Sequence, residues 1–153
     1  MIQTAIDSTK FTARTNVLIA IRPGWADQIL SGNKKWEYRR VALRFGTGGK
    51  LILYASGELH AIIGEATIER IIVEPIEILI AHTVNEVPET AEDLRIAFAG
   101  REVGCAIKVR NPVKYNTQIT LSEIRKQIPN FMPPQGFYYV TDESPLMRIL
   151  HSW

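Results

Sequence analysis

The chain has 153 residues, of which 46% are hydrophobic and 22% charged, and its formal net charge is +2. These values are typical of a soluble globular protein, and the length favours a single domain. No apolar run follows a positive N-terminal stretch, and no segment approaches the roughly 18 apolar residues that a membrane helix needs. The sequence therefore predicts a cytoplasmic domain without a signal peptide or a membrane partner, and its net charge alone does not indicate nucleic acid.

Thiol and imidazole chemistry has little support in the sequence. The single cysteine, Cys105, cannot form an intramolecular disulfide, and its apolar neighbours predict a buried, unreactive thiol. His60, His82 and His151 fall on different predicted elements, where packing or surface roles are expected. Glu58 and His60 lack a third ligand at recognisable spacing, so we expect neither a metal nor another cofactor.

The first part of the chain predicts an arm, a strand, a helix and a second strand. Residues 1–15 are polar and lack periodicity, which favours a flexible arm. Residues 17–21 are apolar and β-branched, as in a buried strand. A helix over 24–30 should end at Gly32, and residues 35–40 predict the second strand.

The middle of the chain is rich in predicted strands. The run Gly46-Thr-Gly-Gly49 indicates a turn, since it lacks the Lys-Ser/Thr pair and the following helix of a phosphate-binding loop. Strands are expected over 50–55 and 61–73, with a bulge at Gly64 in the longer one.

Short helices alternate with strands in the remainder. Helices are predicted over 75–82 and 91–99, and a strand over 103–109. The sequence Thr120-Leu-Ser-Glu123 is a capping box that starts another short helix. After a last strand over 136–140, a C-terminal stripe has helical spacing: Leu146, Ile149, Leu150 and Trp153.

Together these elements predict an α+β fold of about six strands without a βαβ rhythm. The best fit is a mixed, mostly antiparallel sheet curled into a small β-barrel with short helices outside. The domain would cover residues 16–142, between the arm and a helical tail over 143–153. The tail is too short to be stable alone. It must dock on its own barrel or on a second copy of the chain, which leaves a monomer and a homodimer open.

The segment from Lys34 to Arg44 concentrates positive charge around one acid, Glu37. Its cations are Lys34, Lys35, Arg39, Arg40 and Arg44. In a strand, Lys35, Glu37 and Arg39 share one face, and Trp36, Tyr38 and Arg40 share the other. With the aromatic face toward the core, the charged face suits a phosphate or a nucleobase edge. The alternative is an exposed edge strand whose charges prevent aggregation.

The run from Ile21 to Arg40 resembles the opening of the ASCH domain. The family pattern Gly-x-Lys-x-x-Glu-x-Arg is matched by Gly32, Lys34, Glu37 and Arg39. Further matching stretches follow in the same order, and together they cover roughly residues 17–140: 53–56 with 64–65, 100–107 and 133–139.

The resemblance implies a PUA-like β-barrel, related to modules that bind RNA or modified bases. It places a cleft between the first helix, the Lys34–Arg39 strand and the neighbouring loops, with RNA or a modified nucleotide as the ligand. Some relatives carry a helix-turn-helix domain and act in transcription, for which the segment before Val17 is too short. A transcription-related role and a plain protein-interaction module remain alternatives.

Catalysis is the other reading that the resemblance implies. One branch of the family hydrolyses an acylated cytidine with a Lys, a Thr three residues later and a distant Glu. Here Glu37 replaces that Thr, so the amidohydrolase pattern is incomplete. Another member is described as a ribonuclease, which keeps an RNA-directed hydrolase open. Its catalytic groups would be Lys34, Glu37 and Arg39, as base and cations.

In a binding site, Lys34 and Arg39 would contact phosphate, and Glu37 would accept from a base amine or pair with a cation. Other candidates are cations, aromatic faces and polar strand ends: Lys35, Arg40, Arg44, Tyr54, Ser56, Glu65, Gln135 and Tyr138. Each has a plainer alternative. The tyrosines suit the core, Ser56 and Gln135 suit turns, and Glu65 suits an ion pair with a cation such as Arg39.

Overall fold

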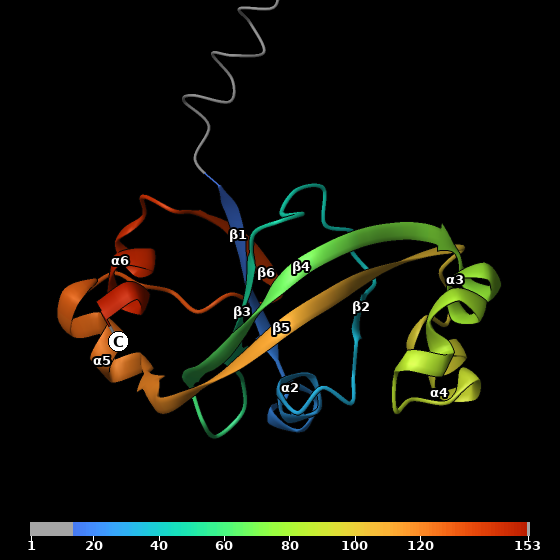
Figure 1. The fold of residues 1–153 in the computed structure, drawn as a ribbon, viewed down its shortest axis with the longest axis horizontal. Helices are drawn as coiled ribbons and strands as arrows, with labels where there is room; N and C mark the ends of the chain where they lie inside the picture. Colours follow the sequence, from blue (N-terminus) through green and yellow to red (C-terminus); the bar gives the residue numbers. More distant parts are fainter. Residues whose placement is uncertain (1–13, 153) are drawn as a thin grey trace, which may run out of the picture.

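The structure is a computed structural model that describes residues 14–152 (Figure 1). Most of the predicted arm and Trp153 lie outside the described residues. The strands are β1 (Thr15–Ile21), β2 (Trp36–Arg39), β3 (Lys50–Ala55), β4 (Ala61–Pro75), β5 (Val103–Thr120) and β6 (Phe137–Thr141). The helices are α2 (Pro23–Leu30), α3 (Ile76–Thr83), the 3₁₀ turn η1 (Val84–Glu86), α4 (Ala91–Ala97), α5 (Leu121–Gln127) and α6 (Pro145–Ser152).

All six strands form one sheet in the order β2-β5-β4-β3-β1-β6. Strands β1 and β3 are parallel, and every other pair is antiparallel. The predicted α+β class with a mixed, mostly antiparallel sheet is therefore confirmed. The sheet curls, but its edge strands β2 and β6 do not pair with each other, so the barrel stays open.

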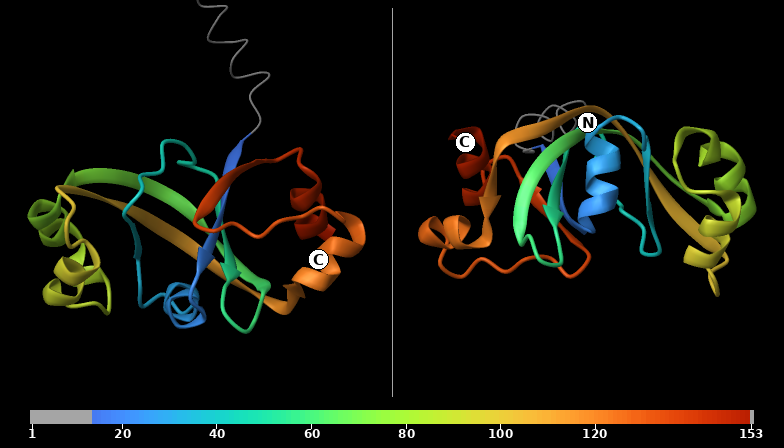
Figure 2. Two further views of the ribbon diagram at one scale, coloured as in Figure 1. Left: turned by 180° about the vertical axis from the view of Figure 1, so that it is seen from behind. Right: turned by 90° about the horizontal axis from the view of Figure 1, so that it is seen from below.

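Two long strands, β4 and β5, form a ribbon that carries helices at both ends. Figure 2 shows α3 and α4 at one end of the ribbon and α5 and α6 at the other. The predicted strand over 103–109 is too short, because β5 continues to Thr120. Most side chains from Arg110 to Gln118 are exposed, so this half of β5 shows no apolar alternation and is held by pairing with β4.

The bulge predicted at Gly64 is present. The pairing of β4 with β5 shifts register between Ile62 and Gly64. A Cβ atom at Gly64 would lie 2.6 Å from the carbonyl oxygen of Val113 and 2.7 Å from a methyl carbon of Leu30. Glycine at this position therefore allows α2 to pack closely over the ribbon.

The core consists of three apolar clusters. One lies between α2 and the sheet and includes Ile29 and Cys105. Burial raises the pKa of the Cys105 thiol. The second lies under α5 and α6, and the third joins β2 to α3 and α4. The tail residues Leu146, Met147 and Ile149 are buried in the second cluster, so the apolar stripe packs on the sheet of its own chain.

Candidate functional site

The three predicted central residues come together at the start of the edge strand β2. The chain leaves α2 through Gly32, whose φ of +88° suits glycine, and Lys34 follows two residues later. The Lys34 Nζ lies 3.7 Å from Oε1 of Glu37, and the Arg39 Nε lies 3.2 Å from Oε2 of the same carboxylate. We call Lys34, Glu37 and Arg39 the charged centre.

Lys34 and Glu37 of the charged centre are buried and Arg39 is half-buried, although the sequence suggested a solvent-facing row of charges. Lys34 is 1% exposed and Glu37 is 7% exposed. Strand β2 is an edge strand, but it is not an exposed one: Trp36 and Tyr38 pack under α3 and α4, and Glu37 faces the other way. Arg39 also donates to the carbonyl of Ala20 at the end of β1. Buried charge of this kind requires partners on every side.

Sequence reasoning missed a second carboxylate at this site. The Lys34 ammonium donates to Oε2 of Glu89, which belongs to the loop between η1 and α4. The other oxygen of Glu89 is buried and has no hydrogen-bond partner among residues 14–152. The two side chains are 55 positions apart, and no spacing rule within one sequence predicts such a contact.

Aromatic rings enclose the rest of the Lys34 ammonium. Its Nζ lies 5.0 Å from the ring centroid of Trp25 and 4.8 Å from that of Tyr38, both within cation–π range. The Tyr38 hydroxyl donates to Thr83 at 2.6 Å, and the Trp36 indole donates to Glu86 at 2.8 Å. Helix α3 and turn η1 therefore fix the orientation of β2.

The environment of Glu37 favours its neutral form more than water does. Burial raises the pKa of its carboxyl, and the nearby charges of Arg39 and Lys34 only partly oppose this shift. A buried carboxyl with a raised pKa beside two cations can exchange a proton with a bound ligand.

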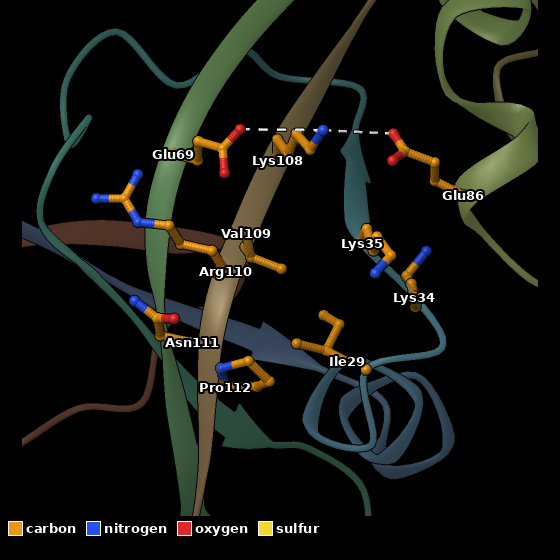
Figure 3. Close-up of a pocket in the computed structure, with 11 residues that line it drawn as sticks. Ile29, Lys34, Lys35, Glu69, Glu86, Lys108, Val109, Arg110, Asn111 and Pro112 are labelled. Atoms are coloured by element: carbon orange, nitrogen blue, oxygen red, sulfur yellow. Dashed lines mark ion pairs between the residues drawn. The ribbon is translucent and has the colours of Figure 1, made fainter.

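Next to the charged centre lies a cavity of about 350 Å³, which we call the basic groove (Figure 3). Its lining comprises Ile29, Gly32, Lys34, Lys35, Glu69, Glu86, Lys108, Val109, Arg110, Asn111 and Pro112. Lys108 pairs with Glu69 at 3.9 Å and with Glu86 at 3.5 Å. Within the described part of the chain, neither Lys35 nor Arg110 forms an ion pair. The sequence pointed to Lys35 but missed Lys108 and Arg110.

Comparison with known proteins decides the family. A family model of the ASCH domain matches residues 19–123. This chain belongs to the ASCH domain family. The ASCH domain-containing ribonuclease of Zymomonas mobilis is 26% identical over 137 residues, which cover 88% of this chain and 90% of that protein.

Solved structures agree with this assignment. The crystal structure of ASCH from Zymomonas mobilis aligns with a TM-score of 0.82 at 26% identity, over 91% of this chain and 95% of that one. The N-terminal domain of McrB from Staphylothermus marinus shares only the fold, with a TM-score of 0.55 at 14% identity over 90% and 93% of the two chains. The PUA-like architecture implied by the sequence agrees with these matches.

Two predicted cations of this ASCH domain lie beyond the basic groove. The Arg40 guanidinium donates to the carbonyls of Ala97 and Ala99 at 2.9 and 3.1 Å, at the end of α4. Arg44 is exposed in the loop after β2, and its backbone N–H donates to the Tyr139 hydroxyl at 2.8 Å. The structure therefore separates them from Lys34 and Lys35.

The remaining polar candidates are also apart from the charged centre. Ser56 donates to Ile21 at 3.2 Å, which closes the end of β3. Glu65 pairs with Lys50 at 3.1 Å, rather than with Arg39, and accepts from Tyr115 at 2.7 Å. Gln135 is exposed in the segment before β6.

The two tyrosine candidates differ in burial. Tyr54 is 2% exposed within the second core cluster, and burial raises the pKa of its phenol. Tyr138 is exposed on β6 and donates to the carbonyl of Met132 at 2.8 Å. Neither lines the basic groove.

No group of three metal-ligating side chains is assembled among residues 14–152. Within the same residues, none of the helices is long and apolar enough to cross a membrane.

Proposed function

We propose that this ASCH domain binds RNA or a modified nucleotide, with phosphate in the basic groove and the base directed toward Lys34, Glu37 and Arg39. One observation carries the proposal: the basic groove, whose Lys35 and Arg110 form no ion pair among residues 14–152, shares Lys34 with the largely buried charged centre. Unpaired cations attract phosphate, and a fixed carboxylate can accept from an exocyclic amine of a base.

Several features support RNA as the ligand class. The net charge of +2 is small, so attraction must come from local concentration of cations. Lys35, in the segment before β2, and Arg110, on β5, supply that concentration. The relative at 26% identity carries the name ribonuclease, which connects the family to RNA.

The test uses labelled single-stranded RNA and a double variant, Lys35→Ala with Arg110→Ala. On single-stranded RNA each cation bound to phosphate contributes about 0.7 to the slope of log affinity against log salt, so loss of two cations should lower the slope by about 1.4. Lys126→Ala removes an exposed lysine on α5, far from the groove, and serves as the matched control. Equal affinity and slope for the double variant and the control would refute binding in the groove.

RNA hydrolysis is the second candidate, favoured by the raised pKa of Glu37 between two cations. Glu37 would take the proton of a 2′-hydroxyl, whose oxygen attacks the adjacent phosphorus. The 5′-oxygen would leave and take up a proton from solvent, giving a 2′,3′-cyclic phosphate and a free 5′-hydroxyl, and Glu37 would return its proton to solvent. Lys34 and Arg39 would stabilise the charge that develops on the phosphoryl oxygens.

Single-turnover cleavage of RNA, with and without chelator, tests this candidate. Glu37→Gln should abolish turnover and leave RNA affinity nearly intact, because the amide keeps the shape but cannot accept the proton. If the unaltered protein cleaves neither RNA nor modified nucleosides, the hydrolase reading is refuted while the binding reading stands.

A further inference from the structure

A second surface, away from the basic groove, combines two exposed aromatic rings and a half-buried one with arginines. Phe45 in the loop after β2 contacts Tyr139 of β6 edge to face at 5.5 Å, and Tyr139 contacts Phe137 in the same way at 5.8 Å. Phe45 is 61% exposed and Tyr139 is 38% exposed. We call these three rings the aromatic strip.

The aromatic strip is continuous with a cavity of about 340 Å³ at the open side of the sheet. Phe137 lines this cavity together with Tyr38, Arg39, Arg40, Val41, Ala97 and Phe98. The cavity thus joins β6 to the end of β2, the two edge strands that do not pair. No Asp or Glu is among its lining residues.

Three arginines lie along this cavity and the adjoining loop: Arg40 lines the cavity with Phe137, the backbone N–H of Arg44 donates to Tyr139, and Arg101 contacts Arg40. Arg40, Arg44 and Arg101 form no ion pair within residues 14–152. Arg101 instead donates to the backbone carbonyl of Arg40, which holds this loop in place. Guanidinium groups beside open aromatic faces are the features that stack nucleobases and bind phosphate in single-strand-binding proteins.

Arg39 connects the two surfaces. Its guanidinium pairs with Glu37 in the charged centre and also lines the cavity next to Phe137. A chain of nucleotides with one base at the charged centre would therefore continue past Arg39 onto the aromatic strip.

We propose that the aromatic strip stacks the bases of neighbouring nucleotides, so that the ligand is a single-stranded RNA segment several nucleotides long. This inference rests on the proposed function of the charged centre and specifies a polymer. A second copy of the chain is a poorer occupant, because a symmetric contact would place arginines against arginines. Stacking tolerates any base, since each has an aromatic face.

The experiment compares Phe45→Ala with the unaltered protein on three probes. These are an oligoadenylate decamer, a decamer of the same charge that lacks bases, and adenosine monophosphate. Loss of one stacking ring should weaken decamer binding about tenfold and leave the other two probes unaffected. Phe45→Trp should restore the affinity. Leu59→Ala removes an exposed apolar side chain at the opposite end of β3 and is the matched control.

Each outcome distinguishes the two proposals. If Phe45→Ala binds the decamer as tightly as the unaltered protein while the groove variants bind weakly, the aromatic strip is refuted and the proposed function stands. If the groove variants bind normally but Phe45→Ala binds weakly, the proposed function fails and the strip is the RNA site. Absence of binding to every probe overturns both. A drop in molecular mass of Phe45→Ala in sedimentation would show that the strip joins two copies.

Discussion

At the scale of single residues, the position of Lys34 changes what its replacement should do. A ligand-contacting lysine at a surface would affect affinity alone. Here the ammonium lies between Glu89, Glu37 and two aromatic rings and is almost fully buried. Removal would leave the buried Glu89 without an ion-pair partner among residues 14–152 and Glu37 with Arg39 alone, so binding and folding are coupled at this residue.

Lys34→Ala should therefore destabilise the domain by about 3 kcal/mol at neutral pH, as expected for one partner of a buried ion pair. The cost should shrink in acid, because loss of Lys34 raises the pKa of Glu37 further and the carboxyl becomes neutral. Urea unfolding at several pH values measures the effect. An unchanged urea midpoint at pH 7 would mean that Lys34 does not stabilise the folded state.

Glu37→Gln gives a prediction of opposite sign. The folded pKa of Glu37 lies above its unfolded value, so its ionisation on raising the pH costs stability. Near pH 4 the neutral carboxyl resembles an amide, and variant and unaltered protein should unfold at similar urea concentrations. As the pH rises to 7, Glu37 ionises in the unaltered protein and its free energy of unfolding falls. The variant has no such ionisation, so at pH 7 it should be the more stable of the two. A difference in stability between the two proteins that stays constant with pH would contradict a raised pKa of Glu37 in the folded state.

At the scale of elements, the β4–β5 ribbon depends on close approach of α2 at the bulge. Gly64→Ala would force its Cβ against Val113 and Leu30, and we expect a loss of about 2 kcal/mol, as for overpacking. Gly24→Ala on the same helix meets nothing within 4 Å and should be neutral or slightly stabilising. Thermal unfolding of the two variants distinguishes a tight contact from a general effect of losing glycine.

Helix α6 is held by burial of Leu146, Met147 and Ile149 in the second core cluster. Each buried apolar side chain contributes about 1.5–3 kcal/mol, so deletion of residues 144–153 should lower the melting temperature by more than about 10 °C. Light scattering on both chains is the companion measurement. A halved mass after deletion would show that the tail also joins two copies.

The sequence predicts an element correctly when its buried side chains recur at a regular spacing or when a local motif marks its end. The stripe of α6 and the Thr120 cap of α5 follow local rules, and both are in the structure: Thr120 accepts from the backbone N–H of Glu123. The second half of β5 has exposed side chains and is defined by its partner strand, so no local pattern marks it. Arg110 lies on that half of β5, so the sequence analysis did not identify it as a residue that lines the basic groove.

At the scale of the whole molecule, the family motif predicted the fold well and the environment of its residues poorly. Gly32, Lys34, Glu37 and Arg39 were recognisable as a set, and the ASCH match confirms the architecture that they imply. Their burial depends on Glu89 and on helices α3 and α4. The contacts of β2 and Lys34 with Thr83 and Glu89 join residues more than 40 positions apart in the sequence. Single-sequence rules describe neighbours within a few positions, so they cannot supply such contacts.

The pairing of β1 has a consequence for synthesis on the ribosome. This strand lies between β3 and β6, with Thr15 opposite Thr141, so one of its two neighbours is translated near the end of the described chain. We expect nascent chains arrested before Phe137 to remain protease-sensitive at β1, and chains released after Ser152 to become resistant. Protease resistance of the shorter nascent chains would show that β1 is secured by β3 alone.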